Sequence, residues 1–132
     1  MQDLNFCGAC GGKKLTAFTD ETFYVGDEVP LHGLSGKRCD SCGEVYFDHE
    51  SQDRYGDAAD ALVLARREAE QKMLLRVRKK LKLTQHQAAR LTGGGHNAFS
   101  RYERGEAQPV PAVINLFRLL DHHPELLREI QQ

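Results

Sequence analysis

All four cysteines of the 132-residue chain lie in its first third, as two Cys-x-x-Cys pairs, and this arrangement constrains the fold more than any other feature. A glycine follows each pair at once, which permits a tight turn that points backbone amides at the sulfur atoms. Two such turns supply four thiolates, a ligand set that suits Zn²⁺ in a closed tetrahedral site. The sequence therefore predicts one structural zinc ion per chain, held by Cys7, Cys10, Cys39 and Cys42.

Two other uses of the cysteines carry less weight. Two structural disulfides suit a secreted chain, but residues 1–5 contain no basic stretch ahead of an apolar run, so we expect a cytoplasmic protein. A redox Cys-x-x-Cys motif explains one pair and not both. Four thiolates leave no open position for water or substrate, which argues against metal catalysis. The six histidines lack the spacing of helical metal motifs, and none is predicted to bind metal.

The segment between and just after the cysteine pairs predicts short β-strands. Residues 16–19 and 21–25 are rich in β-branched and aromatic side chains, and Gly26 with Asp27 is a turn signal. Another short apolar run, residues 45–47, follows the second pair. Together with the cysteines, these runs predict a small zinc ribbon with short β-hairpins.

The second half of the chain predicts a series of helices. Residues 57 to about 81 contain no Gly or Pro, which favours a helix that is continuous or broken once. Thr84 is a suitable N-cap, and Pro111 suits a first helical turn. We place the domain boundary near Arg67, giving domains 1–67 and 68–132. The helices expected in the second domain span residues 73–81, 85–91, 96–104, 111–121 and 124–130.

The charge of the chain is divided between its two parts. Residues 1–60 hold five basic and twelve acidic residues, a net charge of −7, whereas residues 61–132 hold 13 and 7, a net charge of +6. A basic half favours a nucleic-acid partner and an acidic half favours a basic one. No apolar run approaches the ~20 residues that cross a bilayer, so no membrane partner is expected.

Residues 83–105 have the pattern of two helices joined by a glycine-rich turn. On a helical wheel, the polar residues of the second helix fall on one face, opposite Phe99 and Tyr102. Asn97 and Arg101 on that face are predicted to read bases, because Asn bonds adenine and Arg bonds guanine in the major groove. The residues predicted to contact the DNA backbone are Arg78, Lys79, Lys80, Ser100 and Arg104. An ordinary solvated face is the alternative, and the basic run ahead of the motif weakens it.

The pattern Leu-Thr-Gln, Ala89 and Ser-Arg-Tyr-Glu-Arg-Gly resembles the Cro/repressor-type helix-turn-helix family. With the cysteine pairs, residues 93–103 and residues 121–127, nearly the whole chain resembles the MqsA antitoxins of type II toxin-antitoxin systems. The resemblance implies an α+β protein in which an all-α five-helix domain follows the zinc ribbon. It matches Cys7, Cys10, Cys39 and Cys42 to zinc ligands, and Asn97 and Arg101 to base-reading residues. Gly95 stands where most repressors place a Ser or Thr cap.

What the resemblance implies for function is an antitoxin. Its N-terminal domain would neutralise a cognate ribonuclease toxin of the MqsR type, and its C-terminal domain would dimerise and repress its own operon at a palindrome of double-stranded DNA. The acidic domain would attract a basic ribonuclease, with Phe23 and Tyr24 as contacts. Candidate homodimer contacts are the apolar residues Val113, Phe117, Leu120, Leu126, Leu127 and Ile130.

Two further function classes remain open from the sequence. A stand-alone zinc-containing transcription regulator without a toxin would carry the same helix-turn-helix. A small zinc-dependent enzyme is the weakest reading, because no catalytic triad, carboxylate cluster or open metal site is evident. We therefore expect that the protein is not an enzyme.

Overall fold

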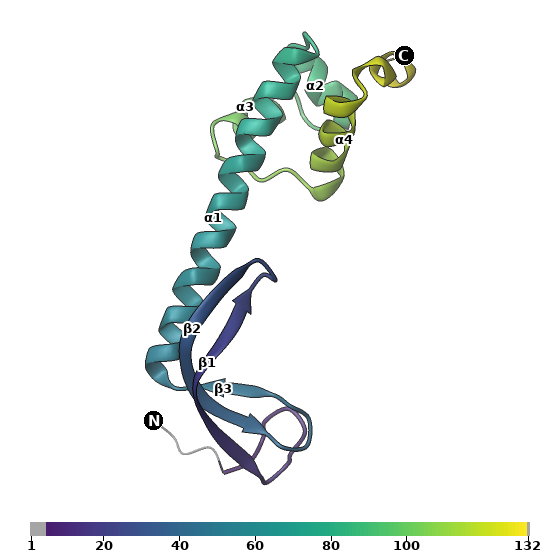
Figure 1. The fold of residues 1–132 in the computed structure, drawn as a ribbon. Helices are drawn as coiled ribbons and strands as arrows, with labels where there is room; N and C mark the ends of the chain where they lie inside the picture. Colours follow the sequence, from purple (N-terminus) through teal and green to yellow (C-terminus); the bar gives the residue numbers. More distant parts are fainter. Residues whose placement is uncertain (1–4, 132) are drawn as a thin grey trace. The chain divides into compact units, whose positions relative to one another are not determined.

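The computed structural model describes residues 5–131, and these form an α+β fold, as the sequence predicts. They contain a three-stranded antiparallel sheet, five α-helices and one 3-10 helix. The chain divides into two compact units, Met1–Val63 and Leu64–Gln132. In chain order the elements are β1 (Leu15–Val25), β2 (Val29–Cys39), β3 (Val45–Phe47), α1 (His49–Lys80), α2 (Gln85–Thr92), α3 (Ala98–Glu103), α4 (Pro111–His122), η1 (Pro124–Leu126) and α5 (Leu127–Ile130). Figure 1 labels the three strands and the helices α1 to α4.

The first unit is built on a β-hairpin longer than the sequence analysis predicted. Strands β1 and β2 have eleven residues each and join through residues 26–28. Gly26 and Asp27 in this turn both have positive φ, the geometry that matches the twist of the strands. The register shifts on either side of Glu21, next to Asp20 with its φ of 54°. Such a bulge lets one strand continue past an interruption in its side-chain alternation, which conceals its length in the sequence.

Aromatic rings fill the small core of the first unit. Phe18 and Phe23 of β1 pack with Phe47 of β3, and Phe47 also packs on Tyr55 of α1, with ring centroids 4.9–6.4 Å apart. Leu34 is fully buried. A core of this size leaves a domain of about 60 residues only marginally stable without a metal ion or other crosslink.

Strand β3 lies so close to β2 that one position between them accepts only glycine. Gly36 of β2 pairs with Phe47, and a Cβ atom at Gly36 would collide with the backbone carbonyl of Tyr46. Successive strand residues point to opposite faces. Phe47 therefore joins the aromatic core while Tyr46 points the other way.

Helix α1 starts earlier and is longer than expected, because it begins at His49 and continues without a break to Lys80. The predicted helix over residues 73–81 is its last part. The boundary between the units, Val63 to Leu64, falls inside this helix, a few residues before the predicted Arg67. No described helix, α1 included, is long and apolar enough to span a membrane.

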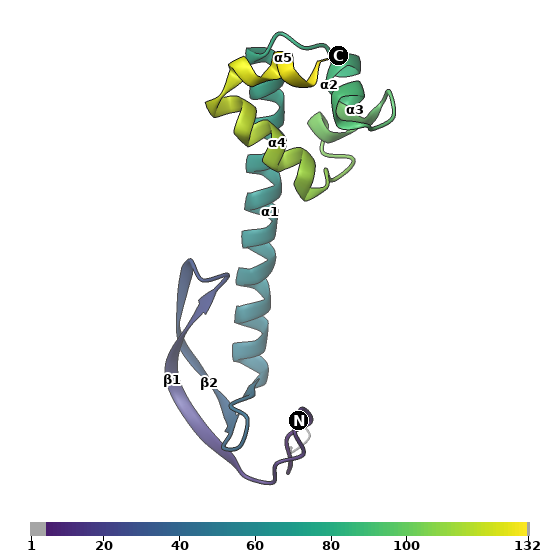
Figure 2. The same ribbon diagram turned by 90° about the vertical axis from the view of Figure 1, so that its right-hand side faces the viewer.

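The second unit packs α2, α3 and α4 around the C-terminal part of α1, an arrangement that Figure 2 shows from the side. Thr84 caps the start of α2 and Pro111 opens α4, both as predicted. The side chain of Gln87 completes a capping box with Thr84, which was not predicted. The last segment starts as the 3-10 turn η1 and not as an α-helix. Residues buried together in the core are Leu74, Val77, Ala88, Ala89, Phe99, Val113, Ile114 and Phe117.

Several residues considered as dimer contacts belong to this core. Val113, Phe117 and Leu120 are at most 6% exposed, so they are not available to a partner while the unit is folded, and that prediction is wrong for them. Leu126 and Leu127 are half-buried, and Ile130 is exposed. The apolar stripe of α4 stabilises its own unit.

Candidate metal centre and nucleic-acid interface

The two Cys-x-x-Cys turns have the same backbone geometry. The N–H of Gly11 donates to the carbonyl of Cys7 at 2.8 Å, and the N–H of Gly43 donates to the carbonyl of Cys39 at 2.9 Å. The two glycines have φ angles of 76° and 80°, in the left-handed region that side chains disfavour. Glycine after each pair therefore closes both turns in one conformation.

These turns bring all four predicted ligands together. The four sulfur atoms lie within 4.8 Å of one another, and Cys7–Cys42 and Cys10–Cys39 approach to 3.6 Å. Zinc–sulfur bonds of ~2.3 Å in a tetrahedron place sulfur atoms about 3.8 Å apart. All four cysteines are free, at distances far beyond the ~2.05 Å of a disulfide. The cluster fits a zinc ion.

Packed together, the thiols differ in acidity. The Tyr46 hydroxyl is the largest cause that lowers the pKa of Cys7, to about 6. The pKa of Cys42 is raised to about 12: a hydrogen bond from the Glu44 backbone lowers it, but the Cys10 thiol, burial and the other thiols outweigh that. A bound Zn²⁺ ion would supply the positive charge that holds all four as thiolates.

Helix α3 is shorter than the predicted span 96–104, but with its caps Asn97 and Arg104 it presents the polar face that the wheel predicts. Asn97, Arg101 and Arg104 are exposed, whereas Phe99 is fully buried and Tyr102 packs on it with centroids 5.5 Å apart. Ser100 is half-buried. The face therefore offers one amide and two guanidinium groups to a partner.

Glu103 fixes α3 to its neighbours. Its carboxylate accepts hydrogen bonds from Arg78 of α1 at 2.7 and 2.8 Å and from Gln85 of α2 at 2.8 Å. Its backbone carbonyl accepts from Gln71 of α1 at 2.7 Å. The side chains of Glu103 and Arg78 are only 5% and 13% exposed.

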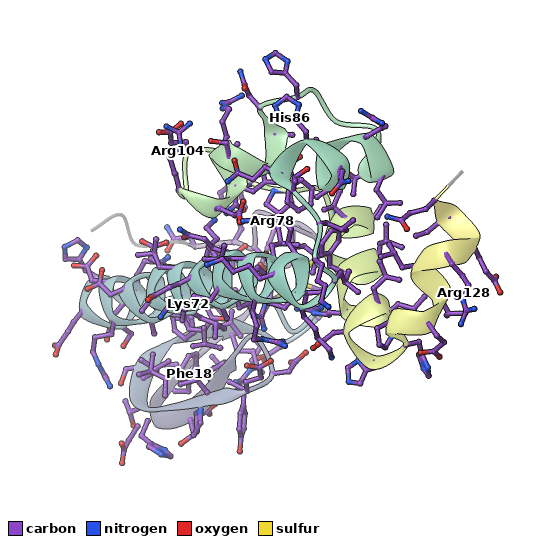
Figure 3. The ribbon with its side chains drawn as sticks, turned by 90° about the horizontal axis from the view of Figure 1, so that it is seen from above. Phe18, Lys72, Arg78, His86, Arg104 and Arg128 are labelled. Atoms are coloured by element: carbon purple, nitrogen blue, oxygen red, sulfur yellow. The ribbon has the colours of Figure 1, made fainter. Side chains whose placement is uncertain are left out.

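Arg78 therefore does not fit the predicted role of a DNA-backbone contact. Its guanidinium also donates to the carbonyl of Leu83 at 2.9 Å, so its donors point into the protein. Figure 3 places Arg78 between α1 and α3, whereas Arg104 points outward. The side chain of the neighbouring Lys79 is exposed, and we find no hydrogen bond or ion pair for its ammonium group among residues 5–131.

Lys80 is exposed and also held by the protein. Its ammonium donates to the backbone and side chain of Asp121, at 2.6 and 3.0 Å, and Arg76 donates to the same carboxylate at 2.8 and 3.0 Å. These hydrogen bonds hold the pKa of Asp121 far below its usual value, and the bond from Arg76 contributes more than the bond from Lys80. The end of α1 is thereby tied to the end of α4.

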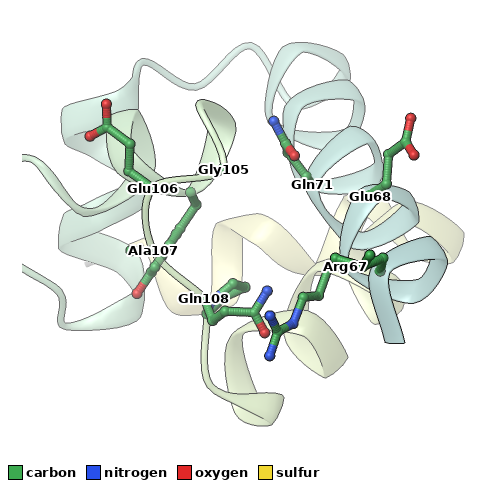
Figure 4. Close-up of a pocket in the computed structure, with 10 residues that line it drawn as sticks. Arg67, Glu68, Gln71, Gly105, Glu106, Ala107 and Gln108 are labelled. Atoms are coloured by element: carbon green, nitrogen blue, oxygen red, sulfur yellow. The ribbon is translucent and has the colours of Figure 1, made fainter. Parts of the chain in front are cut away.

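A cavity of about 520 Å³ lies beside α3, between α1 and the loop that follows α3. Figure 4 shows Gln71 and Gly105 on its walls, with Arg67 near Gln108. The two carboxylates that line it are paired, Glu68 with Lys72 and Glu106 with Arg104. No Ser, Cys or His is among the described residues of its lining, so it offers no such nucleophile or base.

Sequence reasoning missed two contacts. Tyr46 reaches Cys7 across 39 positions, and no spacing rule links residues that far apart. Gln85 carries a hydrogen bond to Glu103 across 18 positions. The only local signal for Tyr46 is strand alternation, which places it opposite Phe47.

Comparison with known proteins finds one family and one relative that this chain resembles over nearly its full length. A family model described as the antitoxin component of bacterial toxin-antitoxin systems, MqsA, matches residues 5–131. The protein named Antitoxin MqsA from Escherichia coli (strain K12) is 42% identical over 130 residues, which cover 95% of this chain and 98% of that protein.

Proposed function

The chain belongs to the MqsA family of bacterial antitoxins, and we propose that it neutralises a cognate ribonuclease toxin of the MqsR type and represses its own operon. In this proposal, the first unit binds the toxin and the second binds double-stranded DNA. Both activities place the protein in the cytoplasm. Neither requires the protein to be an enzyme.

The observation that supports the DNA-binding part of the proposal is the exposed polar face of α3. The buried ion pair between Glu103 and Arg78 holds this helix in place. We assign α2 and α3 as a helix-turn-helix, with Ala88 and Ala89 allowing the two helices to approach closely. Asn97 and Arg101 read base edges in the major groove. Backbone contacts come from Lys79, Lys80, Ser100 and Arg104.

A homodimer would place two copies of α3 in successive major grooves about 34 Å apart, which requires a palindromic operator. The core residues of α4 cannot form its contact. Leu119 of α4 and Ile130 of α5 are among the exposed apolar residues of the second unit, and they support a contact formed by the outer side of these two helices.

For the first unit, we propose one structural zinc ion on Cys7, Cys10, Cys39 and Cys42. Bound zinc would crosslink the two turns of a unit with a small core. The acidic surface would speed the capture of a basic ribonuclease, because opposite charges accelerate encounter. Tyr24 is 60% exposed and Phe23 half-buried, which supports Tyr24 as the more accessible contact.

In the test, the full chain is expressed together with the ribonuclease gene that lies beside the gene for this chain. The same cells carry a reporter driven by the promoter of that operon. We expect the chain to restore growth and to silence the reporter. Arg101→Ala should restore growth without silencing, because the base-reading residue lies outside the toxin-binding unit. Cys39→Ser should fail to restore growth, because it removes a zinc ligand.

The alternative outcome is specific. If the chain silences the reporter but restores growth with none of the neighbouring genes, the result would favour a stand-alone zinc-containing regulator. Rescue that survives Cys39→Ser would contradict the assignment of toxin binding to the zinc unit.

A further inference from the structure

Tyr46 places a hydroxyl group on one sulfur atom of the cysteine cluster. Its oxygen lies 3.3 Å from the sulfur of Cys7. The same oxygen accepts a hydrogen bond from the N–H of Gly8 at 2.9 Å. Two polar partners on adjacent residues therefore hold the hydroxyl in place.

The direction of the bond to Cys7 follows from the protonation states. A metal-bound cysteine is a thiolate and has no hydrogen to donate. The Gly8 amide occupies a lone pair of the Tyr46 oxygen, which leaves the hydroxyl hydrogen free to point at the sulfur. With zinc bound, Tyr46 must donate and Cys7 must accept.

We propose that Tyr46 is a positioning residue of the metal centre, which orients Cys7 and strengthens retention of zinc through an O–H···S hydrogen bond. This inference rests on the proposed zinc site. Cys7 is 1% exposed, so water cannot readily replace the hydroxyl as a donor to its sulfur. Removing an outer hydrogen-bond partner of a metal ligand typically costs 10- to 100-fold in affinity.

The scaffold supports this role. Tyr46 lies in β3, which pairs with β2. The last pair of this ladder joins Val45 to Arg38, the residue just before the proposed ligand Cys39. The Tyr46 ring therefore extends from a strand bonded to the second cysteine turn toward the first. Tyr46 therefore connects the two cysteine turns directly, without the ion between them.

The matched variants are Tyr46→Phe and Tyr55→Phe. Each removes one hydroxyl and keeps the ring, but the Tyr55 ring packs on Phe47 and, within residues 5–131, its hydroxyl makes no hydrogen bond that we find. Full-length proteins loaded with zinc are titrated with a chromophoric chelator. We expect Tyr46→Phe to bind zinc about 10-fold more weakly than the wild type, with Tyr55→Phe unchanged.

A spectroscopic readout separates a hydrogen bond from mere packing. In the Co²⁺-loaded proteins, loss of the donor should move the thiolate-to-cobalt band of Tyr46→Phe to lower energy, since an unbonded thiolate gives up electrons more readily. In ¹¹³Cd-loaded wild type, the Tyr46 hydroxyl proton should be protected from exchange and coupled to the metal. This second measurement needs no variant and remains decisive if Tyr46→Phe fails to fold.

The outcomes are distinct. A wild-type protein that binds no zinc contradicts the zinc proposal itself. Zinc binding that is equal in the wild type and both variants, or a Tyr46 hydroxyl proton without protection or coupling, contradicts the role of Tyr46 and leaves the zinc site intact.

Discussion

Arg101 and Lys79 are both exposed cations of the second unit, but they are expected to act differently on DNA. Replacing Arg101 with Ala should cost about 1–3 kcal/mol per half-site and relax base preference, because a bidentate contact to guanine is lost. Replacing Lys79 with Ala should weaken operator and random DNA alike and reduce the salt slope by about one. Fluorescence anisotropy over a salt series measures both. Equal losses on operator and random DNA for Arg101→Ala would refute its reading role.

Two adjacent residues, Arg78 and Lys79, show why the sequence alone could not predict which basic side chains face solvent. Arg78 and Lys79 stand side by side in one basic run, and composition treats them alike. The structure separates them because α1 turns Arg78 toward Glu103 and Lys79 toward solvent. The partner of Arg78 lies 25 residues away, beyond any local pattern.

At the scale of the element, α3 depends on the buried carboxylate at its end. Glu103→Ala should destabilise the second unit by about 3 kcal/mol or more, because it leaves the guanidinium of Arg78 buried without its partner. Glu106→Ala is the matched control: Glu106 pairs with Arg104 at the surface, and its loss should cost less than about 1 kcal/mol. Urea denaturation gives both values, and equal losses would contradict the assignment.

Elements with strong end signals were predictable. Thr84 marks the start of α2 and Pro111 that of α4, because an N-cap and a first-turn proline both act within the first turn of a helix. The start of α1 at His49 and the length of β1 were not. Both depend on tertiary packing and on a bulge, which local preference does not record.

For the whole molecule, the separate cores of the two units predict separate responses to metal removal. A chelator should unfold the first unit and leave the helical unit folded, because zinc is proposed to stabilise only the former. Two-dimensional NMR of the full chain, before and after chelation, reports on both units. Loss of signals from Phe99 and Phe117 together with those of Leu34 would contradict this independence.

The cluster of four cysteines was predictable because two Cys-x-x-Cys pairs together supply the four thiolates of a tetrahedral zinc site. The faces of α3 followed from helical periodicity, since Phe99 and Tyr102 lie opposite Asn97 and Arg101. The contact of Tyr46 with Cys7 and the partners of Glu103 required the structure, because each contact joins elements that are distant in sequence.

Gly36 affects the cysteine cluster without contacting it. Any side chain there would push β3 away from β2 and carry the hydroxyl of Tyr46 off the sulfur of Cys7. A genetic screen for lost metal retention would then recover substitutions at a residue that has no ligand atom and no charge. The absence of a side chain at Gly36 is therefore expected to be as necessary for metal retention as the four cysteines are.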